Sequence, residues 1–439
     1  MMCNFRYRYN LALCSTIIGV GTLAASFPLV LPVSAALCAT LLFAILLACV
    51  RSDIPRDWLA IILSLKALYA ADIALAIFDG RPLRYAPEIG SDAAQLRGQA
   101  LLMLLLWTAS FIATASAFSG RYLRMQISQV ANENRTWIGI VSTGLVALSQ
   151  IGFIVITIEV GGAAKMLASM SNRHEVYFGI GFLRVVVGAG AIGAALLFLC
   201  GRKKLSWFLA TIIFCELALL GGRSYALFST IIPICMLWIS GSKRIPVGRV
   251  LLMAALALAF VSALGSYRSA QLSAQYHASA GVLSRLVMDT GAADNFPSLL
   301  SLLRRDVVPF SGNEIVASAV LAPVPRAVWK EKPVTDEAAT IGVLLANTDR
   351  VNWGLPIGPH GLAYFTGGAI LIPIFGVISG LFFAYVMTRS GHSVAWAAGA
   401  PFLLLLSPDI LSPSTTARVF VLTTLIIVIS LTLRFRFPR

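Results

Sequence analysis

The sequence predicts an all-α, polytopic integral membrane protein that crosses the bilayer about twelve times and carries one large, mostly helical extracytoplasmic loop. Three observations lead to this fold class. Of the 439 residues, 58% are hydrophobic and only 12% are charged, whereas a soluble domain carries about 25% charged residues. Apolar runs of membrane-helix length follow one another along most of the chain. One long polar stretch, residues 265–360, interrupts these runs.

Each predicted span is an apolar run close to the roughly 20 residues that a membrane helix needs. The runs are 11–29, 33–50, 58–78, 99–118, 137–158, 177–200, 205–220, 225–240, 247–264, 361–387, 394–406 and 419–433. The chain therefore divides into residues 1–264 with nine helices, 265–360 as the loop, and 361–439 with three helices. The run 394–406 is short, so a re-entrant helix is the alternative there.

The basic residues predict the orientation, because short cytoplasmic loops are enriched in Lys and Arg. With both termini in the cytoplasm, most basic clusters fall on that side: Arg51 and Arg56; Arg121, Arg124 and Arg135; Arg202, Lys203 and Lys204; Lys243, Arg244 and Arg249; Arg389; Arg434, Arg436 and Arg439. The formal charge of +15 thus reflects membrane topology, and no nucleic-acid partner is predicted.

Amphipathic patterns within the loop predict short helices at 281–289, 296–305, 313–321 and 335–347, the last behind a Thr335 cap,. Prolines separate these segments. We expect a small helical cap that folds onto the membrane helices.

Several chemistries lose support because their motifs are absent. The sequence has no G-x-x-x-x-G-K-[ST] loop for phosphate, no D-x-D and no H-E-x-x-H,. No cofactor and no metal site is therefore predicted, and the expected chemistry uses arginine, histidine and carboxylates.

Arginines are frequent on the predicted outer side, where the positive-inside rule depletes them. Their forked, permanent charge suits phosphate or pyrophosphate, although ordinary ion pairing is the alternative. Arg223 stands in a short turn between two apolar runs, with Glu216 as a possible partner. Arg184 lies inside a predicted span, where a charge usually faces a cavity.

Two further features allow a structural and a functional interpretation. Lys66 and Asp72 both lie in the third span, and their spacing does not ensure contact on one helix. They form a proton or ion pathway, structural pairs with neighbouring helices, or a site for the lipid carrier. His360, where the loop re-enters the membrane, is either a general base or an interfacial histidine without a role.

Four stretches together resemble the Wzy-type O-antigen and oligosaccharide repeat-unit polymerases. Gly222-Arg223-Ser224 resembles the family's G-[ST]-R-[SG] turn, and the arginine of Ser266-Tyr267-Arg268 follows the span that opens the large loop. The segment Pro323 to Pro333, PVPRAVWKEKP, is similar to I-P-R-x-L-W-x-x-K-P. Gly361-Leu362-Ala363-Tyr364 resembles G-E-x-Y but has leucine in place of the acidic residue. Arg350 and Gly361 match an R-x10-G spacing.

The resemblance implies a glycosyltransferase that joins undecaprenyl-pyrophosphate-linked repeat units on the outer face of the bacterial cytoplasmic membrane, with the glycan lipid and the bilayer as partners. A chain-length regulator protein is a further partner that the resemblance allows. The catalytic candidates are His360, Arg223 and Arg326. The substrate-binding candidates are Arg268, Arg350, Arg184, Lys332 and Tyr364.

Two alternatives remain open. An O-antigen ligase would use the same lipid donor with a different acceptor. A flippase-type transporter would instead depend on Lys66, Asp72 and a central cavity.

Overall fold

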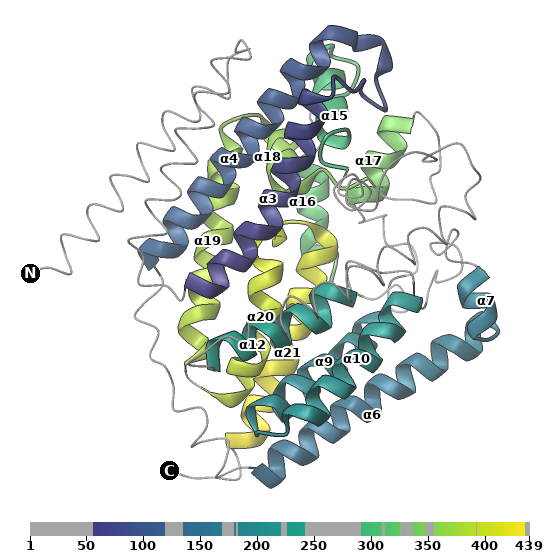
Figure 1. Cartoon of the computed structure of the whole chain (residues 1–439), viewed down its shortest axis with the longest axis vertical. Coiled ribbons are helices and arrows are strands. Elements are labelled where there is room, and N and C mark those ends of the chain that lie inside the picture. The colour runs from purple at the N-terminus through teal and green to yellow at the C-terminus, as the bar shows by residue number, and fades with distance from the viewer. Residues whose placement is uncertain are drawn as a thin grey trace, which may run out of the picture.

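The computed structural model describes residues 56–118, 135–168, 180, 183–220, 226–241, 291–309, 312–324, 329, 337–346, 355–391 and 393–434. All regular structure in these residues is helical. The elements are α3 (Arg56–Phe78), η1 (Pro87–Asp92), α4 (Ala93–Phe118), α6 (Arg135–Val160), α7 (Ala163–Ala168), α9 (Leu183–Leu199), α10 (Lys203–Leu219), the π-helical turn η2 (Leu227–Ile231), α12 (Ile232–Gly241), α15 (Asn295–Arg304), α16 (Gly312–Leu321), α17 (Glu337–Ala346), α18 (Gly358–Gly367), α19 (Leu371–Ser390), α20 (Val394–Leu406), η3 (Ser407–Asp409) and α21 (Pro413–Arg434). Figure 1 shows them as one bundle.

Four of the described helices are long and apolar enough to cross a membrane, namely α4, α6, α19 and α21. They match the fourth, fifth, tenth and twelfth predicted spans. The other predicted spans within the described residues coincide with the shorter helices α9, α10, α12 and α20 and with α3. The first, second and ninth predicted spans lie outside the described residues. The chain is therefore a helical membrane protein, and its crossing number of twelve stays a prediction.

The outward face of α6 carries large apolar side chains, whereas its buried face includes two serines. Ile151, Ile154 and Ile158 are exposed, as expected for contact with lipid. On the opposite face, Ser142 donates a hydrogen bond to the carbonyl of Gly193 (2.7 Å), and Ser149 donates one to the carbonyl of Val187 (2.7 Å). Small residues with hydroxyl-to-backbone bonds are typical of helix contacts in membranes, so α6 and α9 pack closely.

The helix predicted at 361–387 is wrong in one respect, because it is two helices. The chain turns between α18 and α19 at Gly368, whose φ of 76° lies in the left-handed region. A residue with a Cβ atom rarely adopts this conformation. The paired glycines Gly367 and Gly368 thus permit a break that hydropathy does not reveal.

Helix α20 has 13 residues, which is about 20 Å at 1.5 Å per residue and well short of a bilayer core of about 30 Å. It is nearly all buried, and η3 follows it directly. Helix α21 then returns, because Ser430 near its end donates a hydrogen bond to Ser393 at the start of α20 (3.3 Å). The end of α21 and the residues between α19 and α20 therefore lie at one end of the bundle, as the predicted topology requires.

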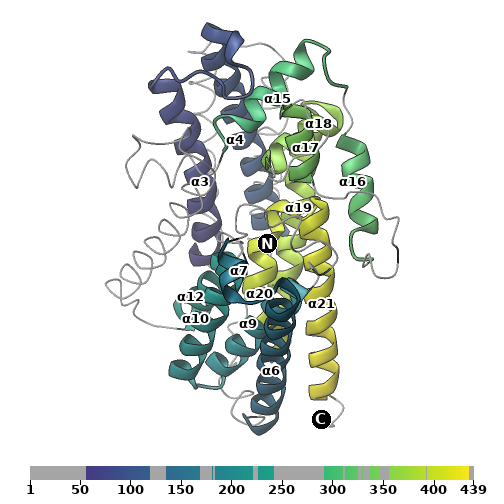
Figure 2. The same cartoon turned by 90° about the vertical axis from the view of Figure 1, so that its right-hand side faces the viewer.

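The described helices of the 265–360 region gather at the opposite end, where α3 ends and α4 begins (Figures 1 and 2). Helices α15, α16 and α17 match the amphipathic patterns at 296–305, 313–321 and 335–347. The pattern at 281–289 and the Thr335 cap lie outside the described residues. Helix α15 packs on α4 and α17, and α16 packs on α18 and α21. These described parts of the predicted cap do fold onto the longer helices.

A buried arginine connects several segments of the chain at this end of the bundle. Arg97 on α4 is 1% exposed, and its guanidinium contacts the Asp294 carboxylate at 3.0 Å. It also donates hydrogen bonds to backbone carbonyls, those of Ala76, Arg81, Pro82 and Ala293. One side chain thus fixes the end of α3, the turn after it and the start of α15.

Helices α4 and α19 approach one another through glycines. A Cβ atom at Gly376 would lie 2.7 Å from the carbonyl oxygen of Trp107, and one at Gly380 would lie 2.7 Å from that of Phe111. The neighbouring atoms are backbone, which cannot move aside cheaply. This four-residue glycine spacing is a known device for close helix contact in membranes.

We predict that Gly376→Val destabilises the protein strongly, because the new side chain would push α4 and α19 apart. Gly144→Val on the exposed face of α6 is the matched control, since a Cβ atom there meets nothing within 4 Å. Thermal unfolding of the purified protein in detergent measures both. Equal melting temperatures for the two variants would contradict the packing argument.

We also predict that Arg97→Met lowers the free energy of unfolding by about 3 kcal/mol or more, because it leaves buried acceptors without their donor. Arg305 forms an exposed ion pair with Glu88 at 3.3 Å, and Arg305→Met should cost less than about 1 kcal/mol. Chemical unfolding in detergent gives the comparison. A loss for Arg97→Met no larger than for Arg305→Met would remove Arg97 from this role.

Candidate functional site

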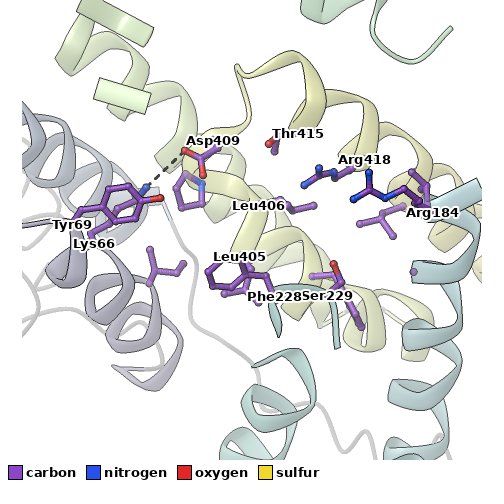
Figure 3. Close-up of a pocket in the computed structure, with 16 residues that line it drawn as sticks. Lys66, Tyr69, Arg184, Phe228, Ser229, Leu405, Leu406, Asp409, Thr415 and Arg418 are labelled. Carbon is purple, nitrogen blue, oxygen red and sulfur yellow. Dashed lines mark ion pairs between the residues drawn. The ribbon is translucent and has the colours of Figure 1, made fainter. Parts of the chain in front are cut away.

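A cavity of about 300 Å³ lies inside the bundle, between α3, α9, η2, α20 and α21. Phe228, Leu405 and Leu406 form part of its apolar lining, whereas its charged groups stand at two ends, with Ser229 and Thr415 between them (Figure 3). The π-helical turn η2 contributes Phe228 and Ser229. Such turns occur often at functional sites. A mostly apolar cavity with a few convergent polar groups is the usual form of a binding site.

Two arginines meet at one end of this cavity. Arg184 is the second residue of α9, and Arg418 comes from the first half of α21. Figure 3 shows their guanidinium groups next to one another at the cavity wall. This end of the cavity therefore carries two basic side chains from two different helices.

Lys66 and Asp409 form the other end. The Lys66 ammonium lies 3.8 Å from a carboxylate oxygen of Asp409, and the side chains are 10% and 45% exposed. The ammonium also lies 5.4 Å from the centre of the Tyr69 ring and 5.2 Å from that of Trp107. Since Lys66 is near the middle of the 23-residue helix α3, Asp409 lies level with the middle of that helix.

Lys66 and Asp72 therefore have separate partners. Asp72 pairs with Arg81 at 3.6 Å and accepts a hydrogen bond from the backbone N–H of Ala293 at 3.2 Å. Asp72 lines neither cavity described here. Each of the two residues therefore has a partner in a segment other than its own turn of α3, and a proton or ion pathway through them stays a prediction.

A second cavity of about 160 Å³ adjoins the first, and the two share Tyr69, Pro408, Asp409 and Thr415. Its polar lining is acidic or hydroxylic: Tyr69, Glu337, Ser379, Asp409, Ser412, Ser414 and Thr415. Among the described residues, no lysine or arginine lines it, whereas Lys66, Arg184 and Arg418 line the larger one. The two cavities thus differ in the charge that they favour.

Of the predicted site residues, Arg184 lines the larger cavity, as a charge inside an apolar helix was expected to do. Tyr364 lines neither cavity and packs edge-on against Phe296, with ring centres 6.0 Å apart. Arg223, Arg268, Arg326, Lys332 and Arg350 lie outside the described residues. Their predicted roles stay predictions.

His360 is 2% exposed and lines neither cavity. Its ring packs edge-on against Phe296 at 5.1 Å, and its Nδ1 atom has no hydrogen-bond partner among the described residues. Burial, with a smaller contribution from the positive charge of Lys66, lowers the pKa of His360 to about 3. His360 is therefore uncharged at neutral pH and packs among neighbouring side chains. The predicted catalytic role is not tested by this geometry.

Asp409 is the site residue that the sequence analysis missed. A signal for it exists, because Ser407-Pro408-Asp409 follows a short apolar run directly. A carboxylate at the end of a helix too short to cross the bilayer has to lie at depth, and charges there usually face a cavity. No group of three or more His, Cys, Asp or Glu in the described ranges is arranged to hold a metal ion.

No family model, no curated protein and no solved structure matches this chain.

The lowered pKa of His360 predicts a loss of stability in acid. Below pH 6.5 the unfolded chain binds a proton at this site that the folded protein does not bind, so stability falls from pH 6.5 towards pH 3,. Between pH 7 and pH 5 the loss is about 2 kcal/mol. Melting curves of the wild type and His360→Phe at both pH values measure it, and the variant should lose less. Parallel pH dependences would show that His360 is not responsible.

Proposed function

We propose that this protein is a membrane glycosyltransferase that polymerises undecaprenyl-pyrophosphate-linked oligosaccharide repeat units on the outer face of the bacterial cytoplasmic membrane. The observation that carries the proposal is the pair of guanidinium groups, Arg184 and Arg418, in a cavity among membrane helices. The motif resemblance supplies the substrate class, and the cavity supplies a cationic place for its pyrophosphate.

The surroundings of Arg418 suit a lipid-linked anion. Val421 lies about one turn after it on α21 and is exposed, so an apolar surface adjoins the cationic one. A polyprenyl chain is apolar and its pyrophosphate is anionic, and these two parts require such neighbouring surfaces. The lipid can therefore remain in the bilayer while its head group reaches Arg184 and Arg418.

In the proposed reaction, an acceptor hydroxyl attacks the anomeric carbon of the donor sugar, and the bond from that carbon to the pyrophosphate oxygen breaks. Negative charge grows on the pyrophosphate as it leaves. Guanidinium groups held in place beforehand stabilise this charge without reorganisation, and each can donate two parallel hydrogen bonds to phosphate oxygens. Arg184 and Arg418 take this role among the described residues. Arg223, Arg268, Arg326 and Arg350 are proposed to add to it.

The first test compares surface glycolipids on a gel from cells with and without the gene. A ladder that collapses to the lipid core plus a single repeat is the expected result. Loss of every repeat from the core, with long polymer left on the lipid carrier, would instead identify a ligase. A transporter would require Lys66 and tolerate Arg326→Ala, whereas the proposed enzyme is impaired by Arg326→Ala.

Variants of the cavity arginines give the sharper prediction. Arg184→Gln and Arg418→Gln should each reduce polymer formation about tenfold or more, since a hydrogen bond to a charged group contributes roughly 1.5–3 kcal/mol. Arg305→Gln is the matched control, because Arg305 is exposed in its ion pair with Glu88. The readout is polymer amount and length at equal protein level in the membrane. An unchanged ladder in both cavity variants would exclude this cavity as the pyrophosphate site.

A further inference from the structure

The two cavities meet at one carboxylate. Asp409 lines both of them, at the end of the larger cavity that lies away from Arg184 and Arg418 (Figure 3). Its side chain is 45% exposed, so it is accessible to a ligand in either cavity. A ligand that binds in the smaller cavity close to Asp409 therefore also lies next to the larger cavity.

The lining of the smaller cavity fits a neutral, hydroxyl-bearing ligand. Glu337 and Asp409 offer acceptor oxygens, while the hydroxyls of Ser412, Ser414 and Thr415 can donate or accept,. A phosphate group would meet carboxylates here without a cation among the described lining residues. A sugar ring carries several hydroxyls and no charge, and it is the ligand class that this lining suits.

We infer that the smaller cavity binds the terminal sugar of the acceptor, and that Asp409 is the general base that takes the proton from its attacking hydroxyl. This inference rests on the proposed function and adds to it an acceptor site and a catalytic residue. Lys66 is a positioning residue, because its ammonium at 3.8 Å fixes the carboxylate between the two cavities.

The step balances as follows. The acceptor hydroxyl loses its proton to Asp409 while its oxygen forms a bond to the anomeric carbon of the donor. The bond from that carbon to the pyrophosphate oxygen breaks, and its electron pair leaves with undecaprenyl pyrophosphate. The negative charge of this leaving group lies at the end of the larger cavity that Arg184 and Arg418 line. Asp409 then returns the proton to water. The oxygen attacks from one cavity and the leaving group departs into the other, so the anomeric configuration inverts.

The test uses the full-length protein in lipid nanodiscs, with undecaprenyl-pyrophosphate-linked repeat units as donor and a short-chain lipid-linked repeat unit as acceptor. Asp409→Asn should lower kcat about 100-fold or more, the usual contribution of a general base, and leave donor affinity unchanged. Asp79→Asn is the matched control, because Asp79 pairs with Arg81 at an exposed site. Asp409→Glu should retain part of the activity.

A pH profile separates a base from a structural residue. Wild-type kcat/KM should fall towards low pH as the base becomes protonated, and the residual activity of Asp409→Asn should lack this fall. Among the described residues, the charged and titratable groups that line the two cavities together with Asp409 are Lys66 and Tyr69 from α3, Glu337 from α17, Arg184 from α9 and Arg418 from α21. Lys66→Met should lower kcat and keep the acidic fall, because it only displaces the carboxylate.

A second variant tests the acceptor site without touching the base. Ser414 is exposed at the smaller cavity, and Ser414→Phe should raise the KM for the acceptor about tenfold while donor affinity stays the same. A proportional loss of donor affinity would overturn the assignment of this cavity to the acceptor.

The outcomes distinguish the two proposals. A wild-type protein that forms no polymer from these substrates overturns the proposed function and this inference together. An active wild type with Asp409→Asn within threefold of it overturns the inference alone. If Asp409→Asn does not accumulate in the membrane, Asp409→Glu provides the test. The longer side chain displaces the base and should lower kcat, and an unchanged kcat for Asp409→Glu would overturn the assignment.

Discussion

The guanidinium of Arg97 is the constraint on which the upper end of the bundle depends. It is buried, and its partners belong to two regions that are far apart in the sequence: the end of α3 with the turn after it, and the start of α15. The Asp72 carboxylate also connects α3 to the start of α15, because it accepts a hydrogen bond from the backbone N–H of Ala293. Because α15 packs on α17, these bonds also locate Glu337 at the smaller cavity. A polar network buried at one end of the molecule thereby sets the geometry of a site nearer its middle.

Much of the architecture could be predicted from local pattern. Helices α6 and α21 follow from apolar runs, and α15, α16 and α17 follow from amphipathic spacing, because both signals are contained in neighbouring residues. The break at Gly368 was missed, since a left-handed glycine leaves no mark in hydropathy. The pairing of Lys66 with Asp409 was missed for a different reason. It joins α3 to η3 across most of the chain, and no spacing rule connects residues so far apart. Arg184 could be assigned to a cavity, because an apolar helix tolerates a charge only where something polar receives it.

In the proposed glycosyl transfer, the two cavities divide the chemistry by charge. The donor leaves as an anion, and the larger cavity offers cations for it. The terminal sugar of the acceptor is neutral, and the smaller cavity offers carboxylates and hydroxyls. The shortness of α20 is what allows the two to meet, because the chain turns at η3 in the interior and brings Asp409 there. A helix of full length would carry that carboxylate to the bilayer surface, away from Lys66 and from the arginines.

The outward faces of α6 and α21 place few demands on the identity of their side chains. Residues such as Ile151, Ile158 and Phe420 are exposed, and lipid distinguishes poorly between one apolar side chain and another. Such positions can exchange among leucine, isoleucine, valine and phenylalanine without loss of stability. Gly376, Gly380 and Arg97 have no equivalent substitutes. At the two glycines any side chain would clash with backbone atoms of α4, and Arg97 supplies several hydrogen-bond donors in one planar group. Substitutions should therefore accumulate fastest on the lipid-facing surface and slowest at a few small or charged positions inside the bundle. Distantly related sequences should then share the helical bundle and single scattered residues rather than continuous stretches of sequence.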